Sequence, residues 1–184
     1  MKKPLLITII VLVVIVLYGF STYNSLITLN VNADTQWKQV ETDYQRRFDL
    51  IPSLVESVKG VMKQEQAVFT AIADARTKYS GAVTADERAK AAGQVESALG
   101  RLLVITENYP QLKSSETMNT FMSQLEGTEN RISVQRARFN DAIKAYNLKV
   151  KRIPSSIVAM IIGFDERSYF EASAGSENAP EVKF

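Results

Sequence analysis

The residues best suited to chemistry lie in two short segments rich in carboxylate and guanidinium groups. One segment reads LEGTENRI over residues 125–132, and the other reads RRFD over residues 46–49. Glu126, Glu129 and Asn130 fall about one helical turn apart, so a helix would place them on one face. Such groups predict either a ligand site or a network of ion pairs that fixes helix register, and we favour the network. Its candidate members are Arg46, Arg47, Asp49, Glu126, Glu129, Asn130 and Arg131.

Missing residue types exclude most catalytic chemistry. The 184 residues include no cysteine and no histidine. Their absence rules out thiolate nucleophiles, disulfides, Ser-His-Asp hydrolysis and the usual transition-metal sites. Carboxylates alone bind hard cations, but the sequence contains no calcium-loop pattern. We therefore expect no enzymatic activity, no catalytic residue, no metal and no cofactor.

The charge balance argues against nucleic acid as a partner. Lysine and arginine number 22 against 20 aspartate and glutamate residues, and two of the basic residues, Lys2 and Lys3, precede the first apolar run. Without those two lysines the rest of the chain balances at 20 against 20. Nucleic-acid-binding domains usually carry a basic excess, so we expect this chain not to bind nucleic acid.

An uncharged stretch from Pro4 to Ala33 contains the apolar run Leu5–Phe20. Extended to Tyr23, the run approaches the ~20 residues that a membrane-spanning helix needs. A cleaved secretory signal is the alternative, but the run is longer than the usual apolar region of about 7 to 15 residues and lacks a small-x-small cleavage site. We expect a retained single-pass anchor over residues 1–23. Because Lys2 and Lys3 precede it, the positive-inside rule predicts a cytoplasmic N-terminus and a folded part outside.

After the anchor, apolar residues recur every three or four positions from Ala33 to Ile72, which predicts a long helix with one apolar stripe. Pro52 interrupts it, because proline lacks the N–H that would bond the carbonyl of Phe48. Two alternatives follow: Pro52 kinks a rod that continues to Tyr79, or it reverses the chain. In the favoured rod, the first part of the stripe has no partner within the chain and mediates self-association. The candidate stripe residues are Trp37, Val40, Tyr44 and Phe48.

Two more helices follow from capping and stop signals. Thr84 and Glu87 form a capping-box pattern that begins one helix, and Pro110 ends it. Ser114 or Ser115 begins another, which Pro154 closes. No strand pattern of alternating residues is present. The predicted fold class is all-α: a transmembrane helix followed by an elongated antiparallel up-and-down bundle over residues 24–152, with three to four long helices and a kink or break at Pro52.

The C-terminal part divides into an apolar segment and an acidic tail. Residues 153–164 are uncharged but too few to span a bilayer, so they are either buried against the bundle or lie in a membrane interface. The helix end before them either interacts favourably with its own dipole and the acidic tail or faces anionic lipid. Its basic residues are Arg136, Arg138, Lys144, Lys149, Lys151 and Arg152. The acidic composition of residues 165–184 predicts a flexible tail.

Several segments, in this order along nearly the whole chain, resemble the LemA family of bacterial membrane proteins. They are Tyr23-Asn24, RRFDLIPSLV (46–55), ENYPQLK (107–113), LEGTENRI (125–132), Ala145-Tyr146-Asn147, Gly163-Phe164, Tyr169-Phe170-Glu171 and the closing APEVKF. The resemblance implies a single-pass helical bundle with no established biochemical activity. Some relatives look like lipoproteins, with a cysteine where this chain has Gly19-Phe20. Because this chain has no cysteine, lipid attachment at that position is excluded.

These observations predict a membrane-anchored helical scaffold or interaction protein of the bacterial envelope, in the cytoplasmic (inner) membrane. Its expected partners are the membrane, a second copy of the chain and other envelope membrane proteins. The alternative is an extracytoplasmic ligand-sensing helical domain that acts through a membrane partner.

Overall fold

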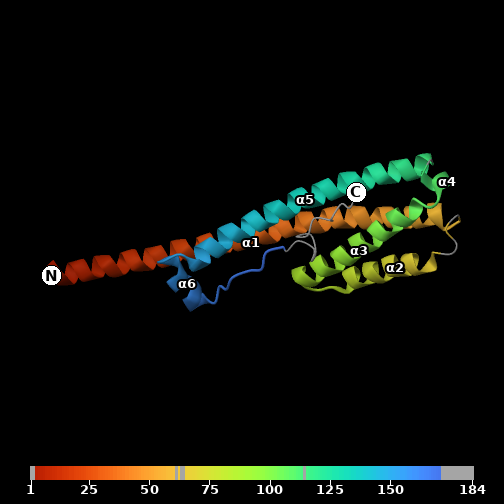
Figure 1. The fold of residues 1–184 in the computed structure, drawn as a ribbon. Coiled ribbons are helices and arrows are strands. Elements are labelled where there is room, and N and C mark those ends of the chain that lie inside the picture. Colours follow the sequence, from red (N-terminus) through yellow and green to blue (C-terminus); the bar gives the residue numbers. More distant parts are fainter. Residues whose placement is uncertain (1–2, 61, 63–64, 114, 171–184) are drawn as a thin grey trace, which may run out of the picture. The chain divides into compact units, whose positions relative to one another are not determined.

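The computed structural model describes residues 3–60, 62, 65–113 and 115–170, and these residues form helices and no strand. The elements are α1 (Lys3–Lys59), α2 (Gln66–Gly81), α3 (Ala85–Thr106), α4 (Pro110–Lys113), α5 (Glu116–Lys151) and α6 (Ser155–Ile162) (Figure 1). This arrangement confirms the predicted all-α helical bundle. The described residues divide into two units, of which unit 1 comprises those of 3–38 and 136–169 and unit 2 comprises those of 39–135 together with Phe170.

Helix α1 continues through Pro52, so the alternative in which proline reverses the chain is wrong. Pro52 is exposed, so the proline lies outside the buried stripe of α1. On either side of it, Ile51 and Leu54 are buried, at 3% and 2% exposure. Burying each of these side chains contributes about 1.5 to 3 kcal/mol, which is comparable to the ~3 kcal/mol cost of an interior proline.

The predicted rod that continues to Tyr79 is also wrong, because α1 ends at Lys59. Gly60 follows, and glycine after a last turn that contains lysine is a typical helix stop. Met62 is fully buried, and its N–H donates to the carbonyl of Val58 at 2.9 Å. The chain then enters α2 at Gln66.

Helices α2 and α3 lie side by side within unit 2 (Figure 1). The predicted capping box starts α3: the Thr84 hydroxyl accepts from the Glu87 N–H at 3.2 Å, and the Glu87 carboxylate accepts from the Thr84 N–H at 3.0 Å. The Val83 N–H donates to the same carboxylate at 3.0 Å. Together these backbone hydrogen bonds lower the pKa of Glu87.

The start of α5 agrees with its prediction to within one or two residues. Helix α3 ends at Thr106, so the predicted stop at Pro110 is wrong. Pro110 instead begins the short α4, because proline fits the first turn of a helix. Ser115 precedes α5, and its hydroxyl accepts from the Met118 N–H at 3.2 Å, as an N-cap does.

The stripe assigned to self-association is buried within its own chain, so its expected exposure is wrong. In unit 1, the ring of Trp37 packs against Phe139 of α5 at 5.4 Å between centroids. In unit 2, Val40 and Tyr44 are fully buried, and Phe48 makes an edge contact with Tyr79 of α2 at 4.5 Å. The break after Lys59 explains the error, since it returns α2 to the stripe that a continuous rod would have left bare.

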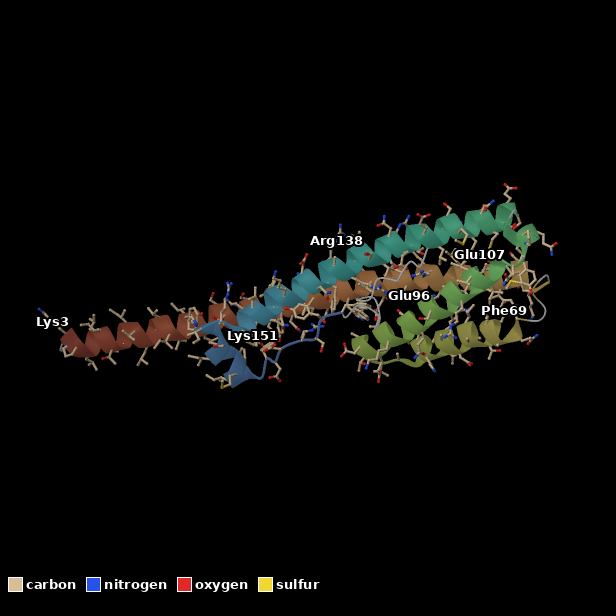
Figure 2. All side chains as sticks on the ribbon, viewed as in Figure 1. Lys3, Phe69, Glu96, Glu107, Arg138 and Lys151 are labelled. Atoms are coloured by element: carbon tan, nitrogen blue, oxygen red, sulfur yellow. The ribbon has the colours of Figure 1, made fainter. Side chains whose placement is uncertain are left out.

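The first part of α1 has the character of a membrane span. One helix among the described residues is long and apolar enough to cross a membrane, and its apolar window is 6% buried. In the part of α1 that follows Lys3, the side chains project outward from the helix (Figure 2). Residues such as Ile7, Leu12 and Leu17 are 55 to 63% exposed. A soluble core helix would bury such side chains.

Candidate functional site

The predicted polar network exists in part, and its centre is Arg47 of α1. The Arg47 side chain is 7% exposed, and its Nη1 donates to the carboxylates of Glu129 on α5 and, at 3.4 Å, Glu96 on α3. Glu96, labelled in Figure 2, is 17% exposed and Glu129 is 47% exposed. One guanidinium therefore joins three helices of unit 2, from positions far apart in the sequence.

The other predicted members do not join this centre. Arg46 donates to Asp43 one turn earlier at 3.1 Å, and Asp49 accepts from Gln45 at 2.7 Å, so both make contacts within α1. Glu126, Asn130 and Arg131 are exposed on α5. The buried residues of that segment are instead Leu125, Thr128 and Ile132, because the helix turns its acidic face outward.

Glu96 was not among the predicted members, although it meets Arg47. It lies next to Val95, on the side of α3 that also buries Ala92 and Leu99. A carboxylate beside a buried stripe residue is a weak signal, because many such residues are solvated. Only the packing of α3 against α1 makes it specific.

A second ion pair in unit 2 also escaped prediction. Arg88, at the start of α3, donates to Glu41 of α1, and its Nε donates to the Ala82 carbonyl at 3.1 Å. Glu41 lies near Tyr79, which is 9% exposed. Burial, reinforced by the negative charge of Glu41, raises the pKa of Tyr79 to about 12.

The chemistry open to these charges is limited. The buried guanidinium of Arg47 and the partly exposed one of Arg88 are both already paired with carboxylates, which suits these ion pairs to holding helices in register. Among the described residues, no group of three or more histidine, cysteine, aspartate or glutamate side chains gathers as a metal site would require. The arrangement therefore supports a structural role.

Unit 2 also contains an open groove of about 970 Å³ between α1, α4 and the start of α5. Its apolar lining includes Leu54 and Val58 of α1 and Met118 and Phe121 of α5. The polar lining consists of hydroxyl and amide groups and one carboxylate, from Ser53, Ser57, Gln111, Ser115, Glu116, Thr117, Thr120 and Gln124. An apolar floor bordered by polar groups is a common composition of a binding surface.

In unit 1, a set of hydrogen bonds fixes the chain after α6. The Tyr146 hydroxyl donates to the Asp165 carbonyl at 2.8 Å, and burial raises the pKa of Tyr146. Asn147 exchanges two hydrogen bonds of 2.9 Å with the backbone of Arg167. Arg167 also contacts Asp34 of α1 at 2.7 Å.

These contacts correct the predicted start of the flexible tail at residue 165, because residues 165–167 are held against the helices. Residues 171–184, which make up most of that predicted tail, lie outside the described part of the chain.

Comparison with known proteins gives a family and two named relatives. The model of the LemA family matches residues 36–184. Magnetosome protein MamQ of Magnetospirillum gryphiswaldense is 29% identical over 180 residues, covering 83% of this chain and 66% of its own. Magnetosome protein MamQ 2 of Paramagnetospirillum magneticum is 26% identical over 175 residues, covering 81% of this chain and 64% of its own.

The chain thus spans less than two thirds of the length of these curated relatives. Together, the apolar start of α1 and these relatives indicate a membrane-associated helical protein. Because the family model covers most of the sequence, including both partners of the Arg47–Glu129 ion pair, the chain belongs to the LemA family.

Proposed function

We propose that this protein is a membrane-anchored scaffold of the bacterial envelope that binds other proteins and carries out no catalysis. The observation that carries the proposal is α1 itself. One helix begins as an exposed apolar span and continues, without interruption, into the buried stripe of the bundle. The folded part is therefore attached directly to the anchor, with no linker between them.

The contacts of α1 just after the apolar run support a retained anchor over a cleaved signal. Thr22 and Leu26 are 1% and 0% exposed, and the ring of Tyr23 contacts Phe164 at 6.5 Å between centroids. Cleavage near Phe20 would leave these packed residues at a free chain end, where helices fray. The protein should accordingly stay in the membrane pellet after carbonate or high-salt washing. Release into the wash would contradict the anchor.

The proposed orientation rests on Lys2 and Lys3, which precede the anchor. By the positive-inside rule, the N-terminus then lies in the cytoplasm, α1 crosses the inner membrane, and the bundle lies on the extracytoplasmic side. A reporter that is active only outside the cytoplasm, fused after Phe184, should be active. Activity confined to a reporter that needs the cytoplasm would reverse the orientation and leave the anchor unaffected.

The groove of unit 2 is the proposed protein-binding surface. Its floor is apolar and its edge carries hydroxyl groups, a composition suited to one side of an amphipathic partner helix. A photo-crosslinking residue at Ser57 or Thr120 should give a protein adduct in living cells. The matched control is Arg131, which is exposed in unit 2 but does not line the groove.

The mass of the adduct identifies the type of partner. An adduct of twice the chain mass indicates self-association, which the buried stripe no longer supports but the groove allows. A larger or smaller adduct indicates another envelope protein. Adducts that are absent at the groove positions, or equal at Arg131, would contradict the scaffold.

The ligand-sensing alternative draws support from the groove volume, which lies in the range of small-molecule pockets. A sensor of this kind would leave the groove probes without a protein adduct.

A further inference from the structure

The short helix α6 presents an apolar face that no described part of the chain covers. Residues 153–164 contain no charged side chain. Ile157, Met160 and Ile161 are 56%, 82% and 77% exposed. Their spacing of three and four positions places them on one face of the helix. Ile153, just before the helix, is 83% exposed.

The opposite face of α6 is packed within unit 1. Ala159 is 1% exposed and lies in a cluster with Leu26 of α1 and Tyr146 of α5. Phe164, just after the helix, contacts the rings of Tyr23 and Tyr146 at 6.5 and 6.4 Å between centroids. Helix α6 is therefore a fixed part of this unit, with one side buried and the other apolar and bare.

Its position along α1 is at the end of the membrane span. The hydrocarbon core is ~30 Å thick, which about 20 helical residues cross at 1.5 Å each. If the span begins near Pro4, it ends near Tyr23, the residue that contacts Phe164. Leu26, which contacts Ala159, lies about 5 Å further along the helix, at the level of the lipid headgroups.

Paired charges lie further along α1 than Leu26, and basic residues end α5 directly before α6. Arg167 contacts Asn30 at 2.8 Å and Asp34 at 2.7 Å, which are the next turns of α1. Lys151 contacts Glu166 at 2.7 Å, and Arg152 is exposed directly before Ile153. Unit 1 therefore changes along α1 from an apolar surface, through the apolar face of α6, to paired charges.

We propose that α6 lies in the interface of the leaflet from which α1 emerges and inserts Ile157, Met160 and Ile161 among the lipids. The bilayer is favoured over a protein partner because the bare face of α6 is continuous with the exposed apolar surface of α1. Phe20 and Tyr23, at the end of that surface, are 66% and 43% exposed. The basic residues Lys151 and Arg152 lie where anionic headgroups would meet them.

This second membrane contact rests on the proposed anchor and gives it a defined consequence. A single helix permits a protein to rotate and tilt, whereas an additional interfacial contact restricts both. Unit 1 would thereby hold a fixed orientation on the membrane surface.

The chain contains no cysteine, so single introduced cysteines can each carry one fluorophore. The full chain would be placed in vesicles of phosphatidylcholine and phosphatidylglycerol, with the fluorophore at Met160→Cys or, in a second variant, Ile157→Cys. Both native side chains are largely exposed, so the fold should tolerate the change. Ala137→Cys, exposed on α5 in the same unit, is the aqueous control, and Leu12→Cys reports the span.

Spin-labelled lipids should quench the fluorophore at positions 160 and 157, most strongly when the label is near the headgroup. Aqueous iodide should quench those positions several-fold less than position 137. Position 12 should respond most to labels deep in the acyl chains. If position 12 is lipid-quenched while positions 160 and 157 behave like 137, the inference is wrong and the anchor stands. If position 12 is open to iodide, the anchor itself is wrong.

A second copy of the chain is the other possible occupant of this face. Mild oxidation of unlabelled Met160→Cys should leave the chain monomeric if lipid covers α6. A disulfide-linked dimer, together with the loss of lipid quenching at position 160, would overturn the proposal in favour of a protein interface.

Discussion

The shared ion pair of Arg47 predicts strongly non-additive losses of stability. Glu96 and Glu129 both accept from the same guanidinium, whose side chain is 7% exposed. Replacing either carboxylate with glutamine leaves the arginine one remaining anion. We expect each of Glu96→Gln and Glu129→Gln to lower the free energy of unfolding by about 1 kcal/mol, with the larger loss at the more buried Glu96.

The double variant should cost much more than the sum of the two. Without either anion, a buried guanidinium has no counter-charge, and breaking a buried pair in this way costs about 3 to 5 kcal/mol. The coupling energy between the two substitutions should therefore be about 1 to 3 kcal/mol. Adding Arg47→Met to the double variant should recover most of the loss, because an apolar side chain of similar length removes the unpaired charge.

The assay is urea denaturation of the full chain in mild detergent, with the loss of helix measured by far-ultraviolet circular dichroism. For a chain of this size, each kcal/mol also corresponds to roughly 2 to 4 °C in melting temperature. Arg46→Met is the matched control, because Arg46 is 58% exposed and pairs only locally with Asp43. Additive single losses, or a further loss on adding Arg47→Met, would refute the reasoning.

Three further changes test other parts of the structure. Thr84→Ala removes the hydroxyl of the capping box and should lower the free energy of unfolding by about 1 kcal/mol, measured by thermal denaturation, whereas Thr84→Ser should not. The raised pKa of Tyr79 means that its unfolded form ionises first, so stability should fall as pH rises from about 10 to 12. Tyr79→Phe should reduce that fall, although Tyr146, whose pKa is also raised, leaves a remainder; an unchanged alkaline profile would contradict the assignment. Trp37→Glu places a charge against Phe139 and should destabilise unit 1 by about 3 kcal/mol or more, while a variant of unchanged melting temperature would show that Trp37 is exposed.

Local signals in the sequence determined the helices and most of their ends. The period of the apolar stripe, the Thr84 and Glu87 capping box and the stop before Pro154 all act within one or two turns, so they can be read without tertiary contacts. The uncharged run of α1 predicted a span on the same basis. Gly60 was an available stop signal, but the prediction weighed only Pro52 as an interruption and therefore extended the rod past Lys59.

Tertiary packing decided which residues meet. The sequence placed Arg47 and Glu129 in one candidate network, but it offered no reason to prefer Glu129 over Glu126 or Arg131, or to include Glu96. That choice depends on the rotation of α3 and α5 about their axes, which is set by the burial of Val95, Leu125 and Ile132. Likewise, composition left residues 153–164 either buried or interfacial. The packing of Ala159 in one cluster with Leu26 and Tyr146 gives α6 one buried side and leaves the other side exposed near the end of the span. The sequence could not predict this arrangement, because an apolar helix of eight residues is too short for its pattern to show which side is buried.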